Sequence, residues 1–220
     1  MLRGLWVTVE RDPAKAGGLG EVSKTIPREM NRHLDMDVRV LVPGLAPILA
    51  EGGWQDAGPC LALDAGVGRG PEPFRLLQRY EDDAEGWVYA VDNPFWFGRF
   101  PHLYHRAGES DPALGADPVF AANMLFNRAA AAFLPYLAGA RARQPGWPLQ
   151  AFEGGLDFVM GHDWLSGPVL GLLPEEVPAG RVFMLHNTYD EQRPPEEAQR
   201  ALGLPERPTA NTFGKFSPLE

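Results

Sequence analysis

Residues 5–42 read LWVTVERDPAKAGGLGEVSKTIPREMNRHLDMDVRVLV, and this stretch decides the fold. It opens on the apolar run Leu5–Val9, which is typical of a buried strand, and it closes on a second such run, Val38–Val42. Between them, apolar residues recur at three- and four-residue spacing from Leu19 to Leu34, which predicts a helix with a kink at Pro27. A strand, a glycine-rich loop, a helix and a strand in this order predict a βαβ unit of a parallel sheet.

The same alternation of strands and helices returns in the C-terminal half. We therefore expect an α/β fold, a Rossmann-like doubly wound parallel sheet, over residues 1–187. Residues 46–115 are expected to be an irregular insertion, and residues 188–220 either a proline-rich, partly mobile tail or the start of a further region of the protein. The further elements predicted are strands at Phe74–Tyr80, Gly86–Val91, Leu156–Met160 and Arg181–Leu185, and helices at Asp117–Leu137 and Ser166–Leu173.

Composition and charge exclude several classes of protein. The 220 residues carry a formal net charge of −9, so the chain lacks the basic surface that a general nucleic-acid-binding protein needs. No stretch has the length of a membrane-spanning helix. Cys60 is the single cysteine, which permits neither an intrachain disulfide nor a cysteine-based metal cluster. We expect a cytoplasmic protein that binds neither nucleic acid nor membrane and uses no metal or cofactor.

The loop between the first strand and the first helix has the chemistry of an anion site. Lys15-Ala16-Gly17-Gly18-Leu19 leads directly into the predicted helix, whose first N–H groups have no partner within the helix and attract negative charge. Glycine lets a backbone approach a ligand closely, and Lys15 adds a positive charge suited to phosphate oxygens. The loop therefore predicts a phosphate or diphosphate site at Lys15, Gly17, Gly18 and Leu19, although a tight turn with a solvent-exposed lysine would give the same pattern.

Histidines follow two of the predicted parallel strands. His162 comes just after Leu156–Met160, and His186-Asn187 comes directly after Arg181–Leu185. Residues at the carboxyl ends of such strands face the ligand crevice, so we expect both histidines to line one site. His162 is expected to donate a hydrogen bond to a sugar hydroxyl or to the transferred group, and its replacement to lower turnover more than stability. The alternative is a buried histidine whose hydrogen bonds are satisfied within the protein.

Three motifs, in this order, resemble those of one enzyme family. Lys15-Ala16-Gly17-Gly18-Leu19 resembles the Lys-x-Gly-Gly-Leu signature of bacterial glycogen synthases and plant starch synthases that use ADP-glucose. Gly161-His162-Asp163-Trp164 resembles their His-Asp-Trp motif. Residues 182–187, Val-Phe-Met-Leu-His-Asn, resemble their strand that ends in His-Asn. The resemblance spans residues 1 to about 187.

This resemblance implies the N-terminal half of a GT-B glycosyltransferase, in which two Rossmann-like domains face each other across a cleft. It implies transfer of glucose from ADP-glucose to an α-1,4-glucan with retention at the anomeric carbon. By the same resemblance, Lys15, Gly17, Gly18, Leu19, His186 and Asn187 would bind substrate and His162 would be catalytic. A C-terminal GT-B domain, in cis or in trans, would be the partner, because the family's nucleotide-binding domain is absent from these 220 residues.

An isolated N-terminal domain of this kind is expected to be inactive or nearly so. Two other interpretations stay open on the sequence alone. The chain could be a noncatalytic module that binds glucan or anions, or part of a GT-B glycosyltransferase that uses a different nucleotide sugar.

Overall fold

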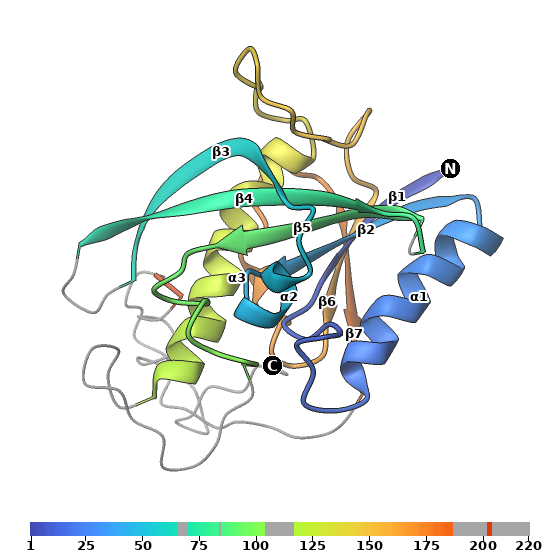
Figure 1. Cartoon of the computed structure of the whole chain (residues 1–220). Coiled ribbons are helices and arrows are strands. Elements are labelled where there is room, and N and C mark those ends of the chain that lie inside the picture. Colours follow the sequence, from blue (N-terminus) through green and yellow to red (C-terminus); the bar gives the residue numbers. More distant parts are fainter. Residues whose placement is uncertain (66–69, 84, 104–116, 187–201, 204–220) are drawn as a thin grey trace, which may run out of the picture.

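The computed structural model describes residues 1–65, 70–83, 85–103, 117–186 and 202–203, and it contains one seven-stranded sheet (Figure 1). The strands lie in the order β3-β4-β5-β2-β1-β6-β7. The five strands from β5 to β7 are parallel to one another, whereas β3 and β4 run antiparallel to their neighbours. The predicted α/β fold with a Rossmann-like sheet is therefore confirmed, with an antiparallel extension at one edge.

The first βαβ unit forms where the sequence predicts it. Strand β1 (Leu2–Val7) pairs in parallel with β2 (Met36–Pro43), and α1 (Leu19–His33) connects them. The helix continues through Pro27, which is buried and cannot donate a backbone hydrogen bond to the preceding turn. The residues of α1 that are fully buried are the small or compact Gly20, Ser23 and Pro27. Small side chains on this face let the helix lie close to the sheet.

The segment expected to be irregular contributes three strands and a short helix. The predicted strands Phe74–Tyr80 and Gly86–Val91 are β4 (Pro71–Glu81) and β5 (Gly86–Asp92), which pair antiparallel, and β5 joins the parallel sheet beside β2. The sequence analysis missed β3 (Gln55–Asp64). Its Gly-Pro pair at residues 58–59 interrupts the strand pattern, and the register shifts there, between Asp56 and Cys60. Proline is tolerated at this point because β3 is an edge strand.

Helices cover both faces of the sheet. Helix α1 and the short α2 (Ala46–Ala50) lie in front of it in Figure 1, and α3 (Pro118–Leu137) lies behind. Helix α3 starts at its N-cap Asp117, whose carboxylate accepts the N–H of Phe120, and most of its side chains are buried. None of the helices in the described ranges is both long enough and apolar enough to cross a membrane.

The last two strands complete the sheet. Strand β6 (Phe158–His162) pairs with β1, and β7 (Gly180–Met184) pairs with β6, with the short α4 (Pro168–Gly171) between them. Helix α4 is shorter than the predicted Ser166–Leu173, because turns occupy the flanking residues. Its N-cap residue is Gly167, which has no side chain to accept a capping hydrogen bond.

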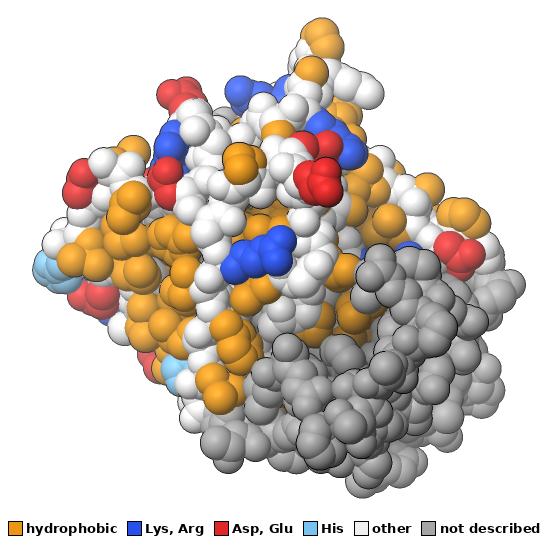
Figure 2. Space-filling model, turned by 180° about the vertical axis from the view of Figure 1, so that it is seen from behind, with side chains coloured by type: hydrophobic (Ala, Val, Ile, Leu, Met, Phe, Trp, Pro, Cys, Tyr) orange, Lys and Arg blue, Asp and Glu red, His pale blue; other side chains and the backbone are white. Residues whose placement is uncertain are grey.

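Strand β7 forms the edge of the sheet and exposes apolar side chains on both of its faces. Val182 and Phe183 are neighbours in the strand and so point to opposite faces, yet they are 38% and 39% exposed. Figure 2 shows a broad group of apolar side chains on the side of the molecule where β7 runs. A parallel strand that is apolar on both faces is typical of the interior of a sheet rather than its edge.

One residue of the predicted mobile tail is packed against the domain. Leu202 is buried against Phe120 and Met124, which lie in the N-terminal part of α3. The rest of the predicted tail, residues 188–201 and 204–220, lies outside the described residues.

Candidate functional site

The fold places two of the predicted motifs side by side. Strands β1 and β6 are neighbours, with Val7 opposite Gly161, so the loop after β1 and the end of β6 lie at the same edge of the sheet. The chain then leaves β1 towards β2 on one side and leaves β6 towards β7 on the other. Such a switch point leaves a crevice at the carboxyl ends of the strands, and ligands of open α/β sheets bind there.

The glycine-rich loop is open to solvent. Lys15, Gly17 and Gly18 are exposed, and Leu19, the first residue of α1, is half-buried. Gly18 is the N-cap residue, and in the described part of the chain no side-chain capping hydrogen bond is made at this end of the helix. These donors and the positive end of the helix dipole therefore face the solvent at the predicted anion site.

Part of this anion site is filled by the protein itself. Oε1 of Glu10 accepts the backbone N–H groups of Ala16 and Gly17, both at 2.8 Å. Glu10 is only 2% exposed, and among the described residues its Oε2 has no hydrogen-bond partner. An entering anion would meet Lys15, Gly18 and the first turn of α1 rather than the N–H groups of Ala16 and Gly17.

Lys15 is held above this loop by carboxylates and by a close contact with the helix. Its Nζ lies 3.2 Å from Asp12 and 3.6 Å from Glu21, and the hydrogen bond to Asp12 raises its pKa. A Cβ atom on Gly20 would lie 2.5 Å from the Cβ of Lys15, so only glycine at position 20 leaves room for the lysine stem. Lys15 is thus fully charged at neutral pH and points its amine towards solvent.

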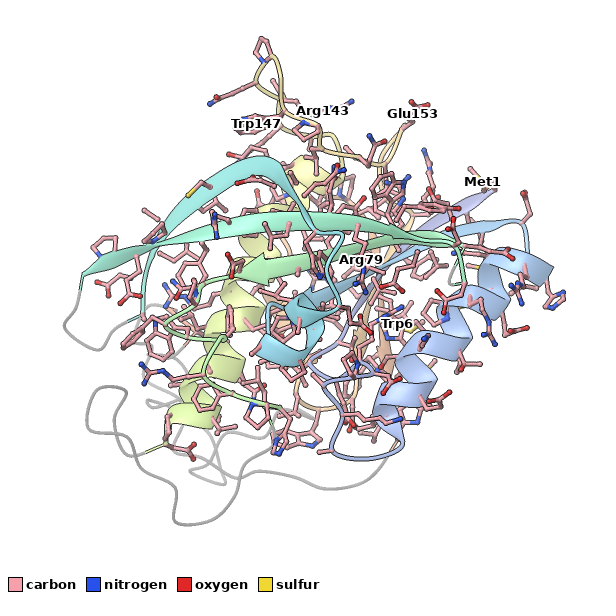
Figure 3. The ribbon with its side chains drawn as sticks, viewed as in Figure 1. Met1, Trp6, Arg79, Arg143, Trp147 and Glu153 are labelled. Atoms are coloured by element: carbon pink, nitrogen blue, oxygen red, sulfur yellow. The ribbon has the colours of Figure 1, made fainter. Side chains whose placement is uncertain are left out.

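His162 is buried at the end of β6 and both of its ring nitrogens have partners. The side chain is 1% exposed. Its Nδ1 lies 3.1 Å from Oγ1 of Thr8 and 3.0 Å from Oγ of Ser23, and its ring centroid lies 4.8 Å from that of Trp6. Trp6, labelled in Figure 3, lies inside the molecule beside α1. Burial, together with a smaller contribution from the nearby His186, lowers the pKa of His162 from 6.5 to about 3, so the ring is neutral.

The two predicted histidines meet in the structure. Nε2 of His162 lies 2.7 Å from Nε2 of His186, and the two rings pack edge to face. His186 is exposed and follows β7, whereas His162 ends the buried strand beside it. Asn187, predicted together with His186, lies outside the described residues.

A chain of hydrogen bonds connects the glycine-rich loop to the histidine pair. Thr8 Oγ1 contacts His162 and donates to the carbonyl oxygen of Glu10, whose side chain holds the N–H groups of the loop. Ser23 adds a second connection, because its hydroxyl contacts His162 and donates to the carbonyl oxygen of Leu19. Lys15 lies outside this chain, since its contacts are the ion pairs with Asp12 and Glu21.

Sequence reasoning missed Thr8, Glu10 and Ser23. One signal was available: Thr8 and Glu10 are polar residues at the end of an otherwise apolar run, where a parallel strand meets its crevice. Ser23 gave no such signal, because a serine in an amphipathic helix looks like an ordinary surface residue.

The turn after His162 is strained and buried. Asp163 has a φ of 61°, in the left-handed region that costs a non-glycine residue about 1 kcal/mol or more. Its N–H donates to the carbonyl oxygen of Met184, and its own carbonyl oxygen accepts the N–H groups of Ser166 and Gly167. Trp164 is 3% exposed and packs in the core. The turn therefore ties the end of β6 to the end of β7 and fixes where His162 points.

A charged cavity of about 330 Å³ lies beside the loop, but its charges are already paired. The buried Arg11 contacts Glu81 at 2.5 Å, Arg79 contacts Glu51 at 2.7 Å, and Lys24 contacts Asp83 at 3.3 Å. Because these groups neutralise one another, the cavity looks like an ion-pair network that anchors the loop to β4. The lining residues are Arg11, Asp12, Lys24, Glu51, Gly52, Gly53, Arg79, Glu81 and Asp83.

The depressed pKa of His162 predicts a loss of stability in mild acid. The unfolded chain takes up a proton near pH 6.5, whereas the folded chain keeps His162 neutral down to about pH 3. Stability is therefore complete above pH 6.5 and falls as the pH drops towards 3. Between pH 7 and pH 5 we expect the free energy of unfolding to fall by about 2 kcal/mol.

Urea denaturation of the chain across that pH range measures this loss. His162→Asn, which cannot titrate there, should flatten the dependence. An equally steep dependence in His162→Asn would show that the acid sensitivity comes from other groups.

The glycines of the loop should differ in what they do. A Cβ on Gly18 would meet nothing within 4 Å, and the φ of −71° suits any residue, so Gly18→Ala should change the free energy of unfolding by less than about 0.5 kcal/mol. If an anion lies on this turn, the added methyl group should nevertheless lower ligand affinity or activity at least tenfold. Gly20→Ala is the contrasting variant, because its Cβ would collide with Lys15, and it should cost about 1–3 kcal/mol.

Thermal unfolding and activity measured on both glycine variants separate the two roles. Full activity in Gly18→Ala would remove the argument that a ligand approaches the backbone there.

Comparison with known proteins identifies the family. The family model described as the starch synthase catalytic domain matches residues 4–220 of the sequence. A glycogen synthase of Pseudomonas savastanoi pv. phaseolicola is 30% identical over 210 residues, which cover 92% of this chain and 37% of that protein. A glycogen synthase of Haemophilus influenzae is 27% identical over 180 residues, covering 79% of this chain and 31% of the relative. The chain thus spans about a third of the length of these relatives.

A solved structure has the same fold. The catalytic domain of starch synthase IV from Arabidopsis thaliana, bound to ADP and acarbose, superposes with a TM-score of 0.68 at 17% identity. The match covers 99% of this chain and 42% of that one. With the family model matching nearly every residue, the chain belongs to the starch synthase catalytic domain family.

Proposed function

We propose that this chain is the N-terminal, acceptor-side domain of a retaining glucosyltransferase that extends an α-1,4-glucan with glucose from ADP-glucose. The observation that carries the proposal is the meeting of the glycine-rich loop and the histidine pair at the switch point between β1 and β6. An anion site and a buried neutral histidine at one edge of the sheet suit a substrate that joins a diphosphate to a sugar.

In the proposed reaction the bond between the anomeric carbon and the diphosphate breaks, and a bond to a hydroxyl oxygen of the glucan forms. Negative charge grows on the departing diphosphate. Lys15 and the first turn of α1 would stabilise that charge, because both present fixed positive potential to the same place. Gly17 and Gly18 leave open space for the diphosphate, since among the described residues no atom beyond the adjoining backbone lies within 4 Å of where their Cβ atoms would be.

His162 and His186 would face the sugar that is transferred. The neutral His162 is held in place by Thr8 and Ser23, so its remaining nitrogen, Nε2, is the one available to a sugar hydroxyl. In the chain without substrate, this nitrogen is within hydrogen-bond distance of Nε2 of His186. We further propose that Asn187 binds substrate beside His186, as the family resemblance implies.

We also propose that a C-terminal GT-B domain, in cis or in trans, completes the active site, with residues 1–187 forming the N-terminal domain. The exposed apolar side chains on both faces of β7 support this, since further polypeptide packed there would remove them from water. The 220 residues alone would then be inactive or nearly so. A second domain also agrees with the length of a glycogen synthase relative, of which this chain covers 37%.

Glucosyl transfer to glycogen tests the proposal. ADP-glucose and UDP-glucose are offered in parallel to the 220-residue chain and to the product of the complete reading frame that encodes it. We expect transfer from ADP-glucose by the complete product and little or none by the 220 residues. Preference for UDP-glucose would overturn the donor assignment, and no transfer from either donor would favour a noncatalytic binding module. Full activity of the 220 residues would overturn the proposed division of the site.

A further inference from the structure

Two buried hydroxyl groups face the same nitrogen of His162. Oγ1 of Thr8 and Oγ of Ser23 lie 3.1 Å and 3.0 Å from Nδ1, and both side chains are at most 1% exposed. A neutral imidazole carries its proton on one nitrogen and a lone pair on the other, so the direction of these contacts decides the tautomer.

The proton of each hydroxyl is engaged elsewhere. Thr8 donates to the carbonyl oxygen of Glu10 at 3.0 Å, and Ser23 donates to the carbonyl oxygen of Leu19 at 2.8 Å. Thr8 Oγ1 also accepts the N–H of Glu10 and lies 3.2 Å from Oγ of Ser23. A hydroxyl has a single proton, so both oxygens present lone pairs to Nδ1. The reverse arrangement, with Thr8 donating to Nδ1, would take away the hydrogen bond that it gives to the Glu10 carbonyl, and a buried carbonyl left without a partner is costly.

Keeping both of these hydroxyl–carbonyl bonds places the ring proton on Nδ1. Nε2 then carries a lone pair and faces Nε2 of His186 at 2.7 Å, which requires His186 to donate. Protonation of both His162 nitrogens is disfavoured, because the ring is buried and the described side chains in contact with it, Trp6, Thr8, Ser23 and His186, include no carboxylate.

We propose that Thr8 and Ser23 are positioning residues that hold His162 as the Nδ1–H tautomer, so that Nε2 accepts a hydrogen bond from a sugar hydroxyl. This inference rests on the proposed function for the identity of its ligand, and it reverses the expectation that His162 donates. In the chain without substrate, the N–H of His186 occupies the acceptor nitrogen. A bound sugar would replace that donor with one of its hydroxyl groups.

Nuclear magnetic resonance of the ¹⁵N-labelled 220-residue chain reads the tautomer directly. Two-bond ¹H–¹⁵N correlations of the imidazole rings at pH 7 distinguish a protonated from an unprotonated ring nitrogen. We expect His162 to show a protonated Nδ1 and an unprotonated Nε2. The opposite pattern, or an averaged one, would overturn the inference, and this result does not depend on which sugar nucleotide the protein uses.

Variants test whether the two hydroxyl groups set the tautomer. Thr8→Val combined with Ser23→Ala should move the proton measurably towards Nε2, and Thr8→Ser should keep the native pattern because it retains the hydroxyl. Thr25→Ala, on the same helix as Ser23, is the matched control. Should the double variant fold poorly, Ser23→Ala alone gives a smaller shift in the same direction. An unchanged tautomer in folded variants would overturn the positioning role.

A kinetic readout separates this inference from the proposed function. In the product of the complete reading frame, Ser23→Ala should lower kcat severalfold more than it changes KM for the donor. If the unmodified protein transferred no glucose, the proposed function would be contradicted, and the tautomer of His162 would still be decided by the NMR spectra. Normal transfer with an unchanged kcat in Ser23→Ala would count against the inference alone.

Discussion

Replacing Lys15 with alanine should lower glucosyl transfer by the complete protein about 10²- to 10³-fold, the size typical of losing one charge-stabilising group in a transition state. The effect should be at the upper end of that range for a structural reason. Asp12 and Glu21 flank the lysine amine, at 3.2 Å and 3.6 Å, and would remain after the substitution. An approaching diphosphate would then meet two carboxylates without the cation that neutralises them.

Stability should change little in Lys15→Ala. The side chain is 43% exposed, and ion pairs in such positions contribute little to folding. Lys24→Ala is the matched control, since Lys24 lies on α1, pairs with Asp83 at 3.3 Å and belongs to the neighbouring cavity. Steady-state kinetics and thermal unfolding of both variants test the assignment. Wild-type turnover in Lys15→Ala would mean that the lysine is an ordinary surface residue.

Partial recovery is expected when the flanking charge is also removed. In the double variant Lys15→Ala with Glu21→Gln, the phosphate no longer meets the exposed carboxylate of the first helical turn. We expect several-fold more activity than in Lys15→Ala alone. No recovery would indicate that Glu21 does not face the bound phosphate.

The second large effect is expected at His162, in both activity and stability. His162→Ala should lower turnover about 10²-fold or more and cost about 2–4 kcal/mol of folding free energy. The stability loss was not expected from the sequence. It follows from the burial of the ring against Trp6 and from the hydroxyl groups of Thr8 and Ser23, which would lose their hydrogen-bond contact with the ring.

Two amide substitutions separate the roles of the ring nitrogens. Asparagine places its amide nitrogen near the position of Nδ1, whereas glutamine reaches the position of Nε2. His162→Asn should therefore regain part of the stability that His162→Ala loses, because it can donate to Thr8 and Ser23, but it should stay inactive. Urea denaturation measures the stability, and transfer assays the activity, of the alanine, asparagine and glutamine variants of His162. High activity in His162→Asn would show that Nε2 is not needed for transfer.

The first 42 residues were enough to predict how the sheet starts. Apolar runs of β-branched and other large residues form strands that are buried on both faces, and this pattern is local in the sequence. Residues Leu5–Val9 and Val38–Val42 therefore indicated β1 and β2 to within a few residues. Strand β3 was missed because its glycine and proline break the local pattern, and an edge strand tolerates them only through its place in the sheet.

The sequence by itself determined the family, the order of the strands and helices other than α2 and β3, and the positions of Lys15, His162 and His186 at the carboxyl ends of strands. These follow from motifs and periodicities that a local stretch of chain carries. The tertiary structure decided which groups meet. It brought His186 against His162 from a different strand, placed the carboxylate of Glu10 on the N–H groups of the loop, and set Thr8 and Ser23 on one face of a buried ring. Such contacts join residues up to 154 positions apart, and their geometry depends on how helix and sheet pack, which no local pattern records.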